Sequence, residues 1–370
     1  MTHLSADELR RYARHVVLPE VGEAGQERLK GARVLCVGAG GLGSPLLLYL
    51  AAAGVGTLGL LDFDTVDESN LQRQILYGTS DVGRLKVEAA AARLSDVNPH
   101  VKIVMHAERL IAANAMELLS SYDVIADGTD NFAARYLVND ACVLLGKPNV
   151  HASIYRFEGQ ASVFWAAKGP CYRCLFPDPP PPGLVPSCAE GGVLGILPGM
   201  LGTLQAAEVL KLILGAGESL VGRLLVVDAL SMSFQMVRLR KNPACAVCGE
   251  SPSITAPSDV EEACAVSEIA PRELRDRLAG EEPVVLLDVR EPWETRLAAL
   301  PGSQNVPLDT LLDRLEMLPR DARIVVYCRS GARSAVAVGV LRAAGFVDVK
   351  RLSGGLQGWR IDVDPSFSVA

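Results

Sequence analysis

A cysteine at the end of one apolar run has the surroundings of a reactive thiol. Cys328 follows the segment RIVVY and opens the loop Cys-Arg-Ser-Gly-Ala-Arg-Ser, which leads directly into a helical pattern. Successive backbone amides, a helix N-terminus and the guanidinium groups of Arg329 and Arg333 would all stabilise a thiolate there. A buried, inert cysteine is the weaker interpretation, because an arginine-bearing loop with a glycine makes a poor core. The segment predicts a nucleophile that forms a persulfide.

Four other cysteines form two pairs with the spacing of a metal site. Cys171 and Cys174 make one CxxC pair, and Cys245 and Cys248 make the second. Four thiolates complete the tetrahedral shell of Zn²⁺ and leave no position for water or substrate, so the predicted role is structural. Because the two pairs are far apart in the chain, a redox CxxC or a chance pairing is the alternative. We expect one zinc ion per chain.

A glycine-rich turn predicts a nucleotide site. Gly38, Gly40, Gly41 and Gly43 follow the apolar run RVLCV and precede a helical pattern, and Asp62 ends the next apolar run. Such glycines let the backbone approach a phosphate, the helix N-terminus presents free amides, and the acid accepts from ribose hydroxyls. Alone, this motif favours a nicotinamide enzyme. Glycines that merely let a strand and a helix pack are the structural alternative.

The residues beyond Asp62 point to a triphosphate instead. Arg73 and Lys86 are cations that hydride transfer does not require, whereas a leaving pyrophosphate is stabilised by Arg, Lys and a metal ion. Asp130 follows another apolar run, within the segment DGTDN, where a strand of an α/β sheet would present a ligand site. A carboxylate is a hard oxygen ligand, so Asp130 is the candidate ligand of Mg²⁺. Each cation on its own would be an ordinary surface charge.

Alternating apolar and helical segments must position these groups. Four buried strands are predicted at Arg33–Val37, Thr57–Asp62, Tyr122–Asp127 and Arg223–Asp228. Helices are predicted between them at 44–53, 83–94 and 131–145. This alternation predicts an α/β fold, a Rossmann-like domain with a mainly parallel sheet covered by helices.

Two changes of composition mark a loop and a domain boundary. The proline-rich run 177–186 removes amide donors and must be a loop. The segment 251–265 is rich in Ser, Pro and acidic residues, which predicts a solvated linker. We therefore expect one domain at 1–250 and a smaller α/β domain at 266–370, where PVVLLDVR and RIVVYCRS predict strands and SAVAVGVLRAAG predicts a helix.

Bulk composition restricts the class of protein. The 370 residues are too many for one ordinary core, and 49% are hydrophobic, as expected of a globular chain. A net charge of −7 provides no basic field for nucleic acid or anionic lipid. The first residues form no apolar signal segment, and no later run offers about 18 uncharged apolar residues. We expect a cytoplasmic protein without nucleic-acid or membrane partners, in which nine cysteines serve metal binding and catalysis.

The order of motifs over residues 5–250 resembles the adenylating domain shared by molybdopterin-synthase adenylyltransferases, thiamine-pathway adenylyltransferases and ubiquitin-activating enzymes. The resemblance implies that ATP and its Mg²⁺ ion contact, besides the glycines, Asp62, Asp64, Ser69, Asn70, Leu71, Gln72, Arg73, Lys86, Asp130 and Asn131. It also implies a homodimer, in which Arg14 would reach the phosphates of the partner subunit, and a zinc ion bound by four cysteines.

Residues 266–365 resemble a rhodanese sulfurtransferase domain. The loop CRSGAR at Cys328, the segment Asp288–Glu291 and the segment Gly354–Trp359 match that family. One departure is visible, because Ala298–Leu300 stands before Pro301 where the family often has Gly-His-Ile. We expect this difference to affect a structural turn more than the chemistry.

The remaining cysteines and histidines carry weaker predictions. Cys188 follows the proline loop without an activating neighbour, so its residues leave catalysis and an inert loop cysteine open; the resemblance implies a covalent bond to a carrier protein. Cys264, in the linker, has no activating neighbour, and Cys36 and Cys142 are expected in the core. The five histidines form no pattern that indicates metal hydrolysis or a Ser-His pair.

The whole chain resembles the bacterial MoeZ-type and eukaryotic fusion proteins that activate ubiquitin-like sulfur carriers. The resemblance implies adenylation of a carrier whose C-terminus is Gly-Gly, followed by sulfur transfer from a Cys328 persulfide to give a thiocarboxylate. Thiosulfate and a cysteine desulfurase are both open as sulfur donor, and the carrier's pathway is open. The alternatives are a scaffold protein that has lost turnover and a nicotinamide-dependent oxidoreductase with an appended domain.

Overall fold

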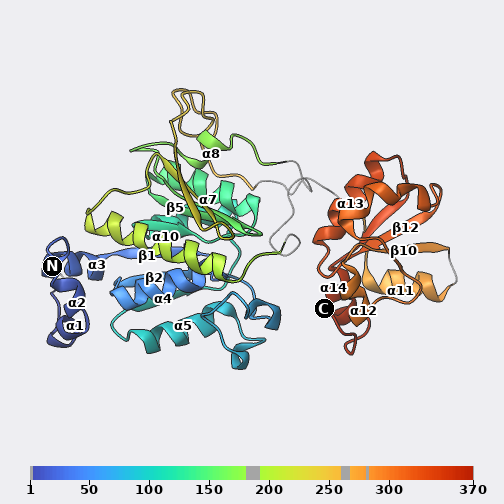
Figure 1. The fold of residues 1–370 in the computed structure, drawn as a ribbon, viewed down its shortest axis with the longest axis horizontal. Helices are drawn as coiled ribbons and strands as arrows, with labels where there is room; N and C mark the ends of the chain where they lie inside the picture. Colours follow the sequence, from blue (N-terminus) through green and yellow to red (C-terminus); the bar gives the residue numbers. More distant parts are fainter. Residues whose placement is uncertain (1–2, 181–191, 260–266, 281–282, 370) are drawn as a thin grey trace. The chain divides into compact units, whose positions relative to one another are not determined.

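The computed structural model describes residues 3–180, 192–259, 267–280 and 283–369. In this structure the glycine-rich turn connects a strand to a helix. Strand β1 (Arg33–Val37) enters the turn and helix α4 (Gly43–Ala53) leaves it. Residues 3–179 and 192–259 belong to one unit, and residues from 267 onward belong to another. Each unit has its own sheet and hydrophobic core (Figure 1).

An eight-stranded sheet forms the centre of the first unit, in the order β3-β2-β1-β4-β5-β6-β7-β8. Its other strands are β2 (Thr57–Leu61), β3 (Lys102–His106), β4 (Val124–Asp127), β5 (Asn149–Tyr155), β6 (Glu158–Phe164), β7 (Arg223–Asp228) and β8 (Ser233–Arg238). The five strands from β3 to β5 in that order pair in parallel, which confirms the mainly parallel sheet. The predicted strand β7 pairs antiparallel with β6, because a hairpin first reverses the chain between β5 and β6.

Helices cover both faces of this sheet. Besides α4, the helices described in the first unit are α1 (Ala6–Arg11), α2 (Ala13–Val16), α3 (Gly22–Gly31), α5 (Lys86–Val97), α6 (Ala112–Ser120), α7 (Phe132–Leu145), α8 (Tyr172–Leu175) and α10 (Ile196–Leu214). Val34 and Cys36 of β1 join the core under α3, α4, α5 and α10, whereas Leu35 and Val37 join a second core under α6 and α7. This alternation follows from the two-residue period of a strand, and it gives three layers (Figure 1).

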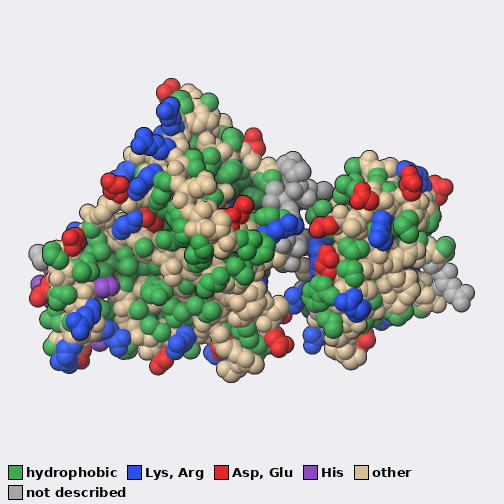
Figure 2. Space-filling model, in the orientation of Figure 1, with side chains coloured by type: hydrophobic (Ala, Val, Ile, Leu, Met, Phe, Trp, Pro, Cys, Tyr) green, Lys and Arg blue, Asp and Glu red, His purple; other side chains and the backbone are tan. Residues whose placement is uncertain are grey.

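Helix α10 is long and apolar enough to cross a membrane by length and composition alone. It packs instead against α4, β5 and β6, and Leu197, Leu201 and Val209 are fully buried there. The helix therefore acts as a core element of the first unit. On the face drawn in Figure 2, acidic and basic side chains are interspersed, as the moderate net charge predicts.

The second unit contains a five-stranded parallel sheet in the order β11-β10-β12-β13-β9. Its strands are β9 (Glu268–Ile269), β10 (Val284–Asp288), β11 (Gln304–Asn305), β12 (Arg323–Tyr327) and β13 (Val349–Leu352), and its helices are α11 (Pro271–Ala279), α12 (Pro292–Leu297), α13 (Ala332–Ala343) and α14 (Gly355–Asp362). Two hydrophobic clusters lie on opposite faces of β12, which contributes Ile324 and Val326 to one and Val325 and Tyr327 to the other. The predicted smaller α/β fold is confirmed.

The first part of the predicted linker packs on the first unit. The amides of Ser253 and Ile254 donate to the carbonyl oxygen of Ala246, and Asp259 accepts the amide of Ala112. Ile254 also packs against the cluster that contains Cys171. Residues 251–259 are therefore anchored by their own contacts, which differs from the solvated linker that their composition predicts.

Candidate active sites and metal centre

The candidate nucleotide-binding groups gather at one edge of the first sheet. Val37, at the end of β1, pairs with Leu61 at the end of β2 and with Asp127 at the end of β4. The glycine-rich turn, Asp62 and the segment DGTDN therefore begin side by side. The carboxyl ends of parallel strands are where α/β sheets bind ligands, so the three predicted segments share one site.

Close contacts require glycine at two positions of the turn. Gly38 has a φ of +89°, and a Cβ atom there would lie 2.9 Å from the carbonyl oxygen of Gly128. A Cβ atom at Gly43 would lie 2.2 Å from the carbonyl oxygen of Gly38. A Cβ atom at Gly41 would lie 3.6 Å from Cγ of Arg73, which places this arginine beside the turn. The turn thus lies directly against the segment that follows β4 and against Arg73.

Asp62 holds the glycine-rich turn in place. Its Oδ2 atom accepts the amide of Ala39 and its Oδ1 atom accepts the amide of Asp64, both at 2.9 Å. Burial raises the pKa of Asp62 above its usual value, although the charge of Lys86 acts in the opposite direction. The predicted contact with ribose would use the remaining lone pairs of this carboxylate.

Lys86 and Arg73 are both held by oxygen acceptors. Lys86 is the first residue of α5, is buried, and donates to Asp64 Oδ2 at 2.8 Å. Arg73 donates from Nη1 to the carbonyl oxygen of Ser69 at 3.2 Å. The candidates Asn70, Leu71 and Gln72 lie in the same tight segment, at and just beyond a short 3-10 helix. The structure therefore brings the two predicted cations to the segments that surround the glycine-rich turn.

The segment after β4 presents an exposed carboxylate on a fixed backbone. Asp130 is exposed, and the Oδ1 atom of Asn131 accepts an amide of the first turn of α7. Asp127 accepts the amide and the hydroxyl of Thr129 with Oδ1, and its Oδ2 atom lies 2.8 Å from Nδ1 of His151. Burial would raise the pKa of Asp127, but the bonds to His151 and Thr129 hold it below its usual value.

Sequence reasoning missed His151 and Arg135. His151 is buried on β5 and reaches Asp127 across the sheet. Arg135, on α7, is also buried, and its Nη2 atom donates to the carbonyl oxygen of Thr129. The signal for Arg135 was a lone arginine one turn after the helix cap Asn131. For His151, only the pairing of β4 with β5 could have shown the contact.

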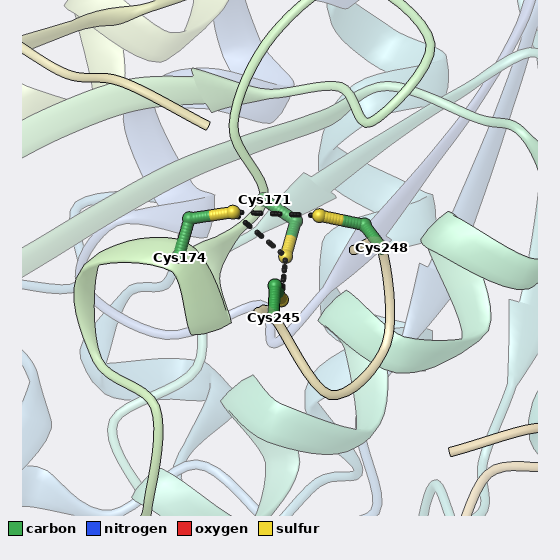
Figure 3. Close-up of side chains that lie close together, drawn as sticks. All are labelled: Cys171, Cys174, Cys245 and Cys248. Carbon is green, nitrogen blue, oxygen red and sulfur yellow. Dashed lines mark hydrogen bonds between the residues drawn. The ribbon is translucent and has the colours of Figure 1, made fainter. Parts of the chain in front are cut away.

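The two CxxC pairs come together in one cluster (Figure 3). Cys171 and Cys174 lie at the start of α8 and within it, and Cys245 and Cys248 lie in the segment after β8. The four sulfur atoms lie within 4.8 Å of one another. Val143, Val247 and Ile254 pack around them, so the cluster lies in apolar surroundings.

The sulfur positions fit one tetrahedral zinc ion. The distance between the Sγ atoms is 3.5 Å for Cys171 and Cys245, 3.4 Å for Cys174 and Cys248, and 3.9 Å for Cys171 and Cys174. Zinc–sulfur bonds of about 2.3 Å in a tetrahedron place the sulfur atoms about 3.8 Å apart. The four cysteines could therefore hold zinc, and the ion would complete its shell without a substrate.

Cys328 lies at the end of β12, and its sulfur faces the turn that follows. Its Sγ atom accepts the amides of Gly331 at 3.2 Å and of Ser334 at 3.5 Å. Its side chain is buried and contacts the hydroxyl of Ser334. These donors are the loop amides and the first turn of α13 that the sequence predicted. Such donors stabilise negative charge on sulfur, as a thiolate or a persulfide requires.

Of the two loop arginines, Arg333 has a partner that the sequence did not predict. Both of its terminal nitrogens donate to the carboxylate of Glu294, on α12. Glu294 is buried, which would raise its pKa, but Arg333 holds that pKa below its usual value. The sequence predicted that the charge of Arg333 stabilises a thiolate at Cys328, and in the structure a carboxylate pairs with that charge.

The departure from the rhodanese pattern lies at a half-buried segment that hydrogen bonds hold in place. Arg290 and Asp288 form an ion pair without exposed side-chain area, and Nη2 of Arg290 also donates to the carbonyl oxygen of Ala298. The amide of Leu300 donates to the hydroxyl of Tyr327. Ala298–Leu300 is therefore fixed by its backbone.

Two of the remaining cysteines lie where the sequence predicted. Cys36 and Cys142 are buried in the cores on the two faces of the first sheet, and burial raises the pKa of both thiols. Cys188 and Cys264 lie outside the described residues. The candidate Arg14 is exposed on α2.

Comparison with known proteins assigns a family to each unit. The ThiF family matches residues 12–247, and the rhodanese-like domain matches residues 270–362. The chain is 50% identical to the probable adenylyltransferase/sulfurtransferase MoeZ of Mycobacterium tuberculosis, over 98% of this chain and 96% of that protein. It is 46% identical to the adenylyltransferase and sulfurtransferase MOCS3 of Bos taurus, over 98% of this chain and 88% of that protein.

Solved structures support the α/β fold over about two thirds of the chain. The structure of E. coli MccB with MccA-N7isoASN superposes with a TM-score of 0.58 and 24% identity, over 65% of this chain and 75% of that one. The structure of E. coli MccB with ATP gives a TM-score of 0.57 and 22% identity, over 64% of this chain and 74% of that one. At this level of identity the likeness concerns the fold.

Proposed function

The chain belongs to the ThiF family with a fused rhodanese-like domain and is an adenylyltransferase and sulfurtransferase, and from this premise we propose that it converts the C-terminal carboxylate of a ubiquitin-like sulfur carrier to a thiocarboxylate. The observation that carries the proposal is the presence, on one chain, of the glycine-rich site at the edge of the first sheet and the amide-lined sulfur of Cys328. Both relatives are named as adenylyltransferase and sulfurtransferase enzymes, which argues against the two alternatives, a nicotinamide oxidoreductase and an inactive scaffold.

The first step is adenylation at the glycine-rich site. The carboxylate of a carrier ending in Gly-Gly attacks the α-phosphorus of ATP, and pyrophosphate leaves. The amides of the turn and of α4 would bind phosphate oxygens, and Arg73 and Lys86 would offset the charge that develops on the leaving group. Asp130 would hold Mg²⁺, which supplies further charge stabilisation at the phosphates when bound.

Further contacts complete this part of the proposal. The segment Ser69–Arg73, together with Asn131 and Asp62, would line the nucleotide. In a homodimer, the exposed Arg14 would reach the phosphates in the partner subunit. We also propose that residues 1–250 form this domain, that 251–265 connect the domains with their first part packed on the first unit, and that 266–370 form the sulfurtransferase domain, in a cytoplasmic enzyme.

The second step is sulfur transfer from Cys328. The outer sulfur of its persulfide attacks the acyl carbonyl and displaces AMP, which leaves the carrier joined to Cys328 through two sulfur atoms. A second thiol, as its thiolate, then attacks Cys328 Sγ and forms a disulfide with it, the bond between the two original sulfurs breaks, and the carrier leaves as a thiocarboxylate. An external thiol must reduce the new disulfide before Cys328 can be loaded again. Cys188 is the candidate for this second thiol or for a covalent carrier adduct. Either thiosulfate or a cysteine desulfurase could supply the persulfide.

Mass spectrometry of the carrier tests the proposal. Candidate carriers are incubated with the chain, ATP, Mg²⁺ and thiosulfate, and we expect replacement of one C-terminal oxygen by sulfur. Cys328→Ala is the matched control, because it should leave the carrier adenylated and free of added sulfur. A carrier that gains sulfur with the Cys328→Ala chain would show that another residue carries the sulfur.

A further inference from the structure

A buried carboxylate near Cys328 has no part in the chemistry described so far. Glu294 accepts from Arg333 at 2.5 Å from Nη1 to Oε2 and at 2.7 Å from Nη2 to Oε1. The two side chains are only 6% and 13% exposed. Charge-assisted bonds of this two-pronged geometry are strong where water is largely excluded.

This ion pair connects the sulfur-binding turn to α12. Arg333 lies between Gly331 and Ser334, whose amides both donate to Cys328 Sγ. Glu294 is itself held in place, because its Oε2 atom also accepts the amide of Glu291 at 2.9 Å. A negative group therefore lies at a fixed position against a cation of the active turn.

We propose that Glu294 is a positioning residue that sets donor specificity: by pairing with Arg333, it removes a positive charge that would otherwise attract a dianionic sulfur donor. This inference rests on the proposed sulfurtransferase role of Cys328. The amides of Gly331 and Ser334 remain as donors to the transferred sulfur, and they are neutral. The site therefore stabilises a thiolate or persulfide but offers less attraction to thiosulfate than the loop sequence suggests.

The effect is expected on the step that loads Cys328. With thiosulfate, the Cys328 thiolate forms a bond to the outer sulfur, the sulfur–sulfur bond of thiosulfate breaks, and sulfite leaves with the bonding electrons. Three negative charges, one on the thiolate and two on thiosulfate, must come together, and no proton is needed. An arginine that is not paired with a carboxylate would stabilise this encounter.

The test is the thiosulfate:cyanide sulfurtransferase reaction of the full chain with Glu294→Gln. Glutamine keeps the size of the side chain and still accepts the Glu291 amide. We expect the KM for thiosulfate to fall roughly tenfold at low ionic strength, with kcat changed by less than about twofold. The difference in KM should shrink in high salt, since salt screens the released charge.

Three further variants separate this effect from a structural one. Glu273→Gln removes the same charge from an exposed pair with Arg277 on α11, and it should leave KM unchanged. Arg333→Gln leaves Glu294 without this partner and should raise KM. In the Arg333→Gln background, adding Glu294→Gln should not lower KM below that of the wild type, because no arginine is released.

The outcomes decide the inference and the proposed function separately. An unchanged KM for thiosulfate in Glu294→Gln overturns the inference. If that variant does not fold, an unchanged KM in Arg333→Gln overturns it instead. A fall in KM that persists in the double variant also overturns it. Mass spectrometry of the wild-type chain tests the proposed function itself. That function fails if neither thiosulfate nor a thiol persulfide produces a persulfide on Cys328.

Discussion

Arg173 binds both carboxylate oxygens of Asp140, with Nε and Nη2 each at 2.8 Å. Arg173 lies between Cys171 and Cys174 on α8, and Asp140 lies on α7. The guanidinium also donates to the carbonyl oxygen of Pro177. One buried ion pair thus fixes the turn that presents half of the metal site to α7, the helix that begins two residues after the candidate magnesium ligand Asp130.

Asp140→Ala should destabilise the first unit strongly. The substitution leaves the buried guanidinium of Arg173 without its carboxylate, and breaking a buried pair in this way costs about 3–5 kcal/mol. Denaturant unfolding of the full chain, followed at Trp165, measures the loss. Asp96→Ala is the matched control, because its exposed pair with Arg93 should contribute less than about 1 kcal/mol. Equal losses in the two variants would contradict the assignment.

Substitutions at the nucleotide site should separate the two activities. Arg73→Ala, Lys86→Ala and Asp130→Ala should abolish carrier-dependent pyrophosphate exchange, because they remove the groups that we propose to contact the triphosphate and its metal ion. Each should retain near-normal thiosulfate sulfurtransferase activity, since the second unit has its own sheet and core. Cys328→Ala should show the reverse. Loss of both activities in a folded variant would contradict the division.

Removal of the metal should affect stability before chemistry. Metal analysis of chain purified without chelator should find one zinc per chain, bound by the four-cysteine cluster. Such sites contribute about 10 kcal/mol of binding free energy, so a chelator should lower the unfolding temperature of the first unit. Less than about a tenth of a zinc per chain would show that the cysteines do not hold it.

Gly355→Ala should disable the sulfurtransferase site alone. Gly355 has a φ of +57°, and an added Cβ atom would lie 2.5 Å from the carbonyl oxygen of Cys328 and 2.7 Å from that of Arg329. The amides of Leu356 and Gln357 now bind these two oxygens, so the clash would displace the active turn. We expect at least a tenfold loss of thiosulfate activity with pyrophosphate exchange intact.

The control for Gly355→Ala is Gly339→Ala, on α13. A Cβ atom at Gly339 meets nothing within 4 Å, so this variant should be active and more stable by about 0.5–1 kcal/mol. Normal thiosulfate activity in Gly355→Ala would show that the turn tolerates the displacement.

Asp127 should give the first unit a defined acid sensitivity. Its pKa is lowered in the folded chain, so its contribution to stability is fully present above the unfolded pKa of about 3.9 and is lost as the pH falls through the folded value. Asp127→Asn should therefore unfold at a lower temperature than wild type at pH 7, and the gap should close as the pH falls below about 4. A gap that stays constant on acidification would contradict this origin.

Local patterns predicted the parts of the molecule that depend on neighbouring residues. The strands β1, β2 and β4 were visible as apolar runs, and the glycine-rich turn was visible because close backbone contacts at Gly38 and Gly43 exclude side chains. The cysteine pairs were visible because each pair lies within one turn of chain. The sequence did not show how the two pairs come together, because this depends on the path of the chain after β8, which brings Cys245 and Cys248 to Cys171 and Cys174.

Contacts between distant segments were not predictable in this way. Asp127 meets His151 only because β4 and β5 pair in one particular register. Glu294 meets Arg333 only because α12 and α13 both begin near the ends of their strands. In each case the residue type alone would suit a surface position, and only the sheet order identifies its partner.

The burial of Cys36 and Cys142 affects which thiols can accept sulfur from a persulfide on Cys328. A chain that stores a sulfane sulfur on one cysteine risks passing it to its own other thiols, because any thiolate in reach can exchange with a persulfide. Of the seven cysteines that the structure describes, these two are sealed in the core with their thiols kept protonated, and four others are committed to the cluster. Among the described residues, the other cysteines are thus poor acceptors of the sulfur on Cys328. That sulfur stays available for an acceptor outside the chain.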